Sequence, residues 1–126
     1  MIETEKLKNA RNLLLKLHKS LVDFERASFT AFYGEVSASQ FLSQLLENPD
    51  LAWLRRFSTL IVDIDEMFAQ KDGFTEDSIS AHLISMRKLI LMEDMAPEFK
   101  SRYELALQGD RGAVSLQAEL MRYLRK

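Results

Sequence analysis

The chain has 126 residues, of which 47% are hydrophobic and 29% charged, a composition typical of one folded domain, here residues 1–126. Its 17 basic and 19 acidic side chains are interspersed and leave a formal net charge of −2. This balance excludes the strongly basic surface expected of a nucleic-acid-binding protein. The absence of cysteine excludes disulfides, thiolate catalysis and cysteine-ligated zinc.

The pattern of apolar residues predicts a soluble, helical protein. The N-terminal segment is polar, and no apolar run approaches the roughly 20 residues that span a bilayer. We therefore expect a cytoplasmic protein with no membrane partner. With four glycines and two prolines, and no sustained alternation of period two, the sequence predicts an all-α fold. The expected architecture is a compact bundle of five to six helices with a long N-terminal helix.

The first third of the chain carries a heptad repeat of apolar residues. Its two rows are Leu7, Leu14, Leu21 and Ser28, and Ala10, Leu17, Phe24 and Ala31. Because no glycine or proline precedes Gly34, the repeat predicts one amphipathic helix over residues 3–33. Such a helix is roughly 45 Å long, whereas a compact chain of this size is about 35 Å across. The helix should therefore overhang a compact monomer, kink, or pack on a second copy. Because no proline or glycine is present to cause a kink, we expect self-association to cover the excess seam.

Helix caps and breakers divide the next part of the chain. Ser37 and Gln40 predict a capping box that opens a short second helix. Asn48 and Pro49 close that helix and open a third one, since asparagine caps helices and proline fits their first turn. The third helix is expected to end at Gly73 and to pair with the first helix as the long central antiparallel pair.

Three more signals predict the remaining helices. Thr75 is expected to cap a fourth helix, and Pro97 to begin a fifth one that ends at Gly109. The segment Gly109–Gly112 is interpreted as a linker, because it is short and rich in glycine. A last helix is expected from about Ala113.

Four residues spaced by seven form a lane at the edge of the apolar stripe of the first helix. They are Arg11, His18, Glu25 and Phe32. His18 and Glu25 lie two turns apart and could converge on a ligand, or a neighbouring helix could place its own polar group between them. The alternative is a simple boundary between core and solvent, in which His18 makes one hydrogen bond.

Trp53 lies in the segment WLRRF (residues 53–57), a mixture of aromatic and basic residues that can stack on nucleobases. Trp53 could also line a ligand cavity. Its position beside Leu54 and Phe57 fits a core or interface aromatic equally, since these two residues follow the helical period of the core. The weak candidates for ligand binding are therefore His18, Glu25 and Trp53.

The sequence lacks the patterns that indicate catalysis or metal binding. Its two histidines, His18 and His82, form no Glu-x-x-His, His-x-x-x-His or His-Glu-x-x-His pattern, so no metal site is expected. It also contains no nucleophile elbow, dinucleotide fingerprint or phosphate loop, and we expect neither catalytic residues nor a cofactor. Of the acidic residues Asp63, Asp65 and Glu66, only Asp65 lies where it can reach the apolar face.

Two segments resemble a family of small, all-helical bacterial proteins that has no assigned activity. They are LHKSLVDFERASF (residues 17–29) and DLAWLRRFSTLIVDIDE (residues 50–66). The resemblance extends over about half of the chain. It implies a bacterial, cytoplasmic, helical protein and implies no catalytic residue or cofactor.

Taken together, these features favour a non-catalytic helical module for protein interaction or regulation. We expect it to self-associate, as a homodimer, through the seam of the first helix, and to bind a further protein partner. The alternative is a small-molecule-binding helical protein or enzyme. Its pocket would lie between the first and third helices and would use His18, Glu25 and Trp53.

Overall fold

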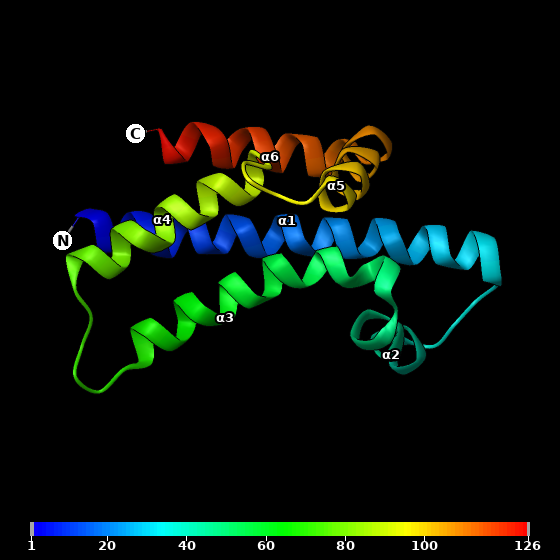
Figure 1. Cartoon of the computed structure of the whole chain (residues 1–126), viewed down its shortest axis with the longest axis horizontal. Helices are drawn as coiled ribbons and strands as arrows, with labels where there is room; N and C mark the ends of the chain where they lie inside the picture. Colours follow the sequence, from blue (N-terminus) through cyan, green and yellow to red (C-terminus); the bar gives the residue numbers. More distant parts are fainter. Residues whose placement is uncertain (1, 126) are drawn as a thin grey trace.

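The structure, a computed structural model, describes residues 2–125, which form six α-helices, one 3₁₀ helix and no strand. The elements are α1 (Ile2–Tyr33), α2 (Ala38–Glu47), η1 (Pro49–Leu54), α3 (Arg55–Ala69), α4 (Glu76–Ile90), α5 (Pro97–Gly109) and α6 (Arg111–Leu124). The predicted all-α bundle with a long N-terminal helix is confirmed. Figure 1 shows α1 running along the length of the molecule, with α3 on one side and α6 on the other. Within residues 2–125, no helix is both long and apolar enough to cross a membrane.

The helix ends that depend on local signals are where the sequence predicts them. Gly34 follows α1 with a φ of +93°, a conformation that glycine adopts without strain, and its N–H donates to the carbonyl of Thr30 at 2.8 Å. The capping box of α2 is present, because the Ser37 N–H donates to Gln40 at 2.8 Å and the Gln40 N–H donates to Ser37 at 3.1 Å. Thr75 caps α4, and Pro97 opens α5.

The prediction of one continuous helix from Asn48 to Gly73 is wrong. The Asn48 side chain accepts a hydrogen bond from the Asp50 N–H at 2.9 Å, and the chain then forms η1 before α3 begins at Arg55. In a 3₁₀ helix, side chains three residues apart lie above one another. This geometry places Leu51 and Leu54 on one side, where both are buried.

The interpretation of residues 109–112 as a linker is also wrong, since α6 begins at Arg111 rather than near Ala113. Asp110 is its N-cap and accepts a hydrogen bond from the Gly112 N–H at 2.9 Å. The other carboxylate oxygen of Asp110 accepts a hydrogen bond from the Ser20 hydroxyl at 2.6 Å. One residue therefore separates α5 from α6, and it is tied to the middle of α1.

The central helix is α1, but α3 is not its principal partner as the sequence analysis expects. It packs most extensively against α6, and also contacts α3, α4, α5 and η1. Its seam is consequently covered by its own chain. Five seam residues have no exposed surface: Leu7, Ala10, Leu14, Leu17 and Leu21.

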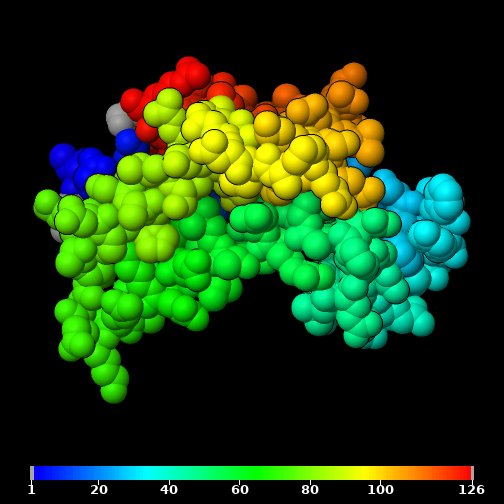
Figure 2. Space-filling view, viewed as in Figure 1, coloured from blue at the N-terminus to red at the C-terminus, as the bar shows by residue number. Residues whose placement is uncertain are grey.

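Only the last turns of α1 extend beyond this cover, where Phe32 is 84% exposed and Tyr33 70% exposed. Figure 2 shows these turns, together with α2, forming one end of the molecule. The overhang is therefore confined to the C-terminal end of α1, and the buried part of the seam offers nothing for a second copy to cover.

Candidate functional site

Neighbouring helices place charged groups against the polar lane of α1. Arg11 donates two hydrogen bonds to Asp65 of α3, at 2.9 and 2.7 Å, which raise the pKa of the guanidinium. Two heptads further along, Arg102 of α5 donates to Glu25 at 2.8 Å. Neighbouring helices therefore supply a partner to each charged residue of the lane, but none of these groups bridges His18 and Glu25.

His18 lies between these two ion pairs and takes part in neither. Its ring is stacked near Phe57, with 6.4 Å between the centroids, and within residues 2–125 it makes no hydrogen bond or ion pair. Burial lowers its pKa from the ordinary value of 6.5, because the imidazolium loses hydration without gaining a partner. His18 and Glu25 thus do not converge on one point, because Glu25 turns to Arg102.

The carboxylate of Glu25 lies at one side of a cavity of about 320 Å³ beneath the end of α1. The cavity wall includes Phe29, Phe32, Asp50 and Arg102. Burial raises the pKa of Glu25, and the Arg102 guanidinium opposes this rise while the Asp50 charge adds to it. A titratable group with a shifted pKa in a cavity is a recognised feature of functional sites.

Trp53 lies inside an aromatic cluster rather than in a cavity. Its ring is 6% exposed and packs against three other rings at centroid distances of 5.9 to 6.1 Å: Phe57, Phe99 and Tyr103. Its indole N–H is buried and has no hydrogen-bond partner within residues 2–125. The structure therefore gives Trp53 a place in the core where η1, α3 and α5 meet.

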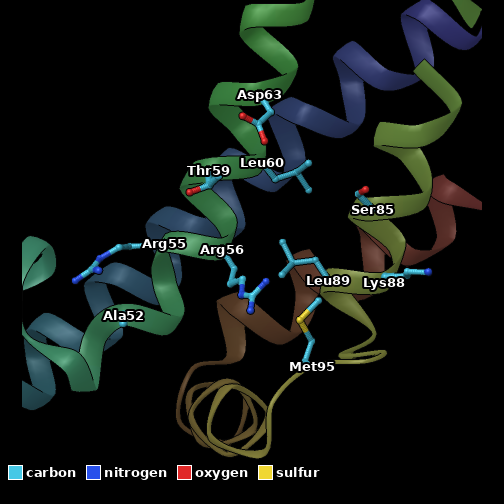
Figure 3. A pocket seen from close by; sticks show the side chains of 10 residues that line it. All are labelled: Ala52, Arg55, Arg56, Thr59, Leu60, Asp63, Ser85, Lys88, Leu89 and Met95. Carbon is cyan, nitrogen blue, oxygen red and sulfur yellow. The ribbon is translucent and has the colours of Figure 1, made fainter. Parts of the chain in front are cut away.

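The largest cavity that we describe is a groove of about 560 Å³ between α3 and α4. In the space-filling view, α4 and the segment after it lie above α3 on the visible face (Figure 2). The groove is lined by Ala52, Arg55, Arg56, Thr59, Leu60, Asp63, Ser85, Lys88, Leu89 and Met95. Figure 3 shows Leu60 and Leu89 pointing toward each other across it, with the Arg56 guanidinium and the Met95 side chain beside them.

The charged side chains around the groove differ in whether they have a hydrogen-bond partner among residues 2–125. Arg55 points away from it (Figure 3) and donates to the carbonyls of Leu45 and Leu46 at 3.3 and 2.7 Å, which anchors the end of α2. The side chains of Arg56, Asp63 and Lys88 make no hydrogen bond or ion pair within the part of the chain that the structure describes. The groove therefore combines an apolar floor with charges of both signs that have no partner among residues 2–125.

A tight turn after α4 positions the Met95 side of the groove. The Met92 and Glu93 N–H groups donate back to Leu89 and Lys88 at 3.2 and 2.9 Å, which is the hydrogen-bond pattern of a Schellman motif. Met92 and Asp94 have φ values of 59° and 57°, a region that residues other than glycine adopt at a cost. The turn thus retains a conformation that its residues disfavour, and Met95, which follows it, lines the groove.

The three predicted ligand-binding residues do not meet at this groove. Glu25 lines the smaller cavity, whereas His18 and Trp53 line neither of the two. Neither cavity lies between α1 and α3, where packed core residues such as Leu14 and Ile64 have no exposed surface. Within residues 2–125, no group of three or more histidine, aspartate or glutamate side chains could hold a metal ion.

The groove is the feature that sequence reasoning missed. Its one available signal is the pair Arg56 and Asp63, seven residues apart on the outer face of α3, next to the exposed Val62. The structure adds α4, whose Ile84 is 56% exposed and lies one helical turn before Lys88, a residue that lines the groove. Comparison with known proteins adds no assignment, because no family model, curated protein or solved structure matches the chain.

Proposed function

We propose that this chain is a non-catalytic interaction module that binds an amphipathic helix of another polypeptide in the groove between α3 and α4. The observation that carries the proposal is the combination of an apolar floor, Leu60, Leu89 and Met95, with the unpartnered charges of Arg56, Asp63 and Lys88. A helix laid into a groove buries apolar side chains on the floor and pairs its charges with the rim. The predicted bacterial origin and cytoplasmic location stay predictions.

The groove also gives a better basis for self-association than the seam of α1. The residues Leu7 to Leu21 of that seam are already covered by the chain itself. The outer faces of α3 and α4, in contrast, carry exposed apolar side chains, Val62 at 51% and Ile84 at 56%. Exposed apolar surface rimmed by charge is typical of interaction sites.

Site-specific photo-crosslinking tests this function in the cells that produce the protein. A photoreactive amino acid replaces Thr59 or Ser85, which line the groove, and in a matched control it replaces the exposed Glu104 on α5. We expect a defined polypeptide to crosslink at both groove positions and not at Glu104. Mass spectrometry identifies the crosslinked peptide, whose sequence should have the apolar spacing of an amphipathic helix. Crosslinks that are absent, or that are equally strong at Glu104, would contradict the proposal.

A second candidate function is supported by the cavity beneath the end of α1. There the buried carboxylate of Glu25, its raised pKa, the half-buried Arg102 that pairs with it and the aromatic Phe29 and Phe32 form a pocket suited to a small amphipathic molecule. Native mass spectrometry of the purified protein tests it. A retained mass that disappears in Glu25→Gln would support this function, and a ligand-free spectrum after incubation with a metabolite extract would contradict it.

A further inference from the structure

We infer that the helix bound in the groove is α3 of a second copy of this chain, in a dimer with a two-fold axis that passes beside Thr59 and Leu60. The inference rests on the proposed function of the groove and names its partner. It starts from the spacing of two charges. Arg56 and Asp63 are separated by seven residues, so they lie two turns apart on the same face of α3.

The two charges are self-complementary under a two-fold axis. When two copies of α3 pack antiparallel about the midpoint between residues 59 and 60, position 56 of one copy faces position 63 of the other. Arg56 then meets Asp63 of the partner subunit, and the symmetry repeats the same ion pair at the other end of the interface. Seven residues keep the two groups too far apart to pair within one helix, where only positions three or four apart meet.

The absence of intrachain partners agrees with this arrangement. Within residues 2–125, the side chains of Arg56 and Asp63 form no ion pair or hydrogen bond, although those of Arg55 and Asp65 on the same helix do. Asp65, two positions from Asp63, is held by Arg11 at 2.7 Å, and Arg55, next to Arg56, is held by two α2 carbonyls. The side chains of Arg56 and Asp63, which both line the groove, are therefore available to pair with another chain.

The shape of the surface fits the same partner. A partner that fills the groove must present a protruding ridge. The outer face of α3, with Thr59 and the half-exposed Val62, forms such a ridge directly beside the groove. In a two-fold dimer each copy contributes both, so each α3 ridge enters the groove of the other copy. The contact brings together two copies of the α3–α4 pair, which is the packing of a four-helix bundle.

Charge exchange between two variants tests this dimer. Arg56→Glu places two acidic residues opposite each other in its own homodimer, and Asp63→Arg places two arginines opposite each other. Each variant alone should therefore weaken dimerisation at least about tenfold in sedimentation equilibrium, since opposed like charges disfavour association. Mixed in equal amounts, the two variants should form a heterodimer, because both of its charge pairs are then opposite in sign. The double variant Arg56→Glu/Asp63→Arg should recover the homodimer.

Matched control variants test whether the loss of dimerisation is specific to charges that line the groove. Arg111→Glu and Glu104→Arg make the same charge changes at exposed positions on α6 and α5 and should leave dimerisation unchanged. Circular dichroism of every variant should retain the helical spectrum. A wild-type protein that stays monomeric at high micromolar concentration overturns the inference, and so does a mixture of the two variants that stays as weak as each alone.

The photo-crosslinking experiment separates this inference from the function on which it rests. A crosslink from Thr59 to α3 of the same chain supports both. A groove-specific crosslink to another protein supports the function and overturns the identity of the partner. No groove-specific crosslink overturns the function itself, even where the purified chain dimerises.

Discussion

Glu25 accepts a hydrogen bond from Arg102 at 2.8 Å, across 77 positions of sequence, and this contact joins the end of α1 to α5. The carboxylate side chain is 5% exposed, whereas the guanidinium is 32% exposed. Of the two charged groups, Glu25 therefore loses most of its hydration, whereas Arg102 keeps part of its contact with water. Burial is the largest influence on its pKa and raises it, despite the opposing charge of Arg102.

Glu25→Gln tests the balance between burial and pairing. Because the pKa of Glu25 is higher in the folded chain than its ordinary value of 4.5, the folded state binds the proton more tightly than the unfolded state. The associated stabilisation is fully present below about pH 4.5 and is lost as the pH rises through the raised pKa. The free energy of unfolding of the wild type, minus that of Glu25→Gln, should therefore fall over this interval and then level off. Urea unfolding at several pH values measures this difference, and a difference that rises with pH would contradict the assigned cause.

Arg102→Met removes the partner of a buried charge and should be more damaging than Glu25→Gln. It leaves the carboxylate buried without its hydrogen bond, which costs about 1–3 kcal/mol at neutral pH. The double variant Glu25→Gln/Arg102→Met should recover part of this loss, since no charge then stays buried. A double-mutant cycle from urea unfolding gives the coupling energy. A coupling near zero would show that the two side chains do not stabilise each other.

The sequence predicts those parts of the fold that depend on neighbours along the chain. Gly34, Ser37 and Thr75 act within four residues of themselves, and each ends or begins a helix as expected. The pairing of Glu25 with Arg102 depends instead on how α5 crosses α1. No local pattern encodes that crossing, because it follows from the packing of the whole bundle.

The groove was not predictable for a similar reason. The heptad of α1 indicates a long apolar seam correctly, but it cannot show that α6 covers that seam more extensively than α3 does. The surface left for a partner is what remains after this packing, and it lies on α3 and α4. The charges of Arg56 and Asp63 look like an ordinary solvent-facing pair until α4 and Met95 are placed beside them.

His18→Gln tests whether this histidine is only a boundary residue. Since His18 has no polar partner within residues 2–125, its replacement should change the free energy of unfolding at pH 8 by less than about 1 kcal/mol. Burial lowers its pKa in the folded chain. The wild type should therefore lose stability relative to the variant as the pH falls below about 6.5 toward that lowered pKa. Titration of the His18 ring by NMR checks the direction of the shift, and a pKa above 6.5 would indicate a carboxylate partner.

Asp110 joins two roles that can be separated by substitution. It caps α6 through the Gly112 N–H at 2.9 Å and accepts the Ser20 hydroxyl of α1 at 2.6 Å. Asp110→Ala removes both hydrogen bonds and should lower the free energy of unfolding by about 1–2 kcal/mol, the usual cost of losing an N-cap. Asp110→Asn should retain most of this stability, because asparagine caps helices equally well and its amide can still meet the Ser20 hydroxyl. Ser20→Ala removes only the link to α1 and should cost less than Asp110→Ala. Equal losses for Ser20→Ala and Asp110→Ala would show that the link to α1, rather than the cap, is the stabilising contact.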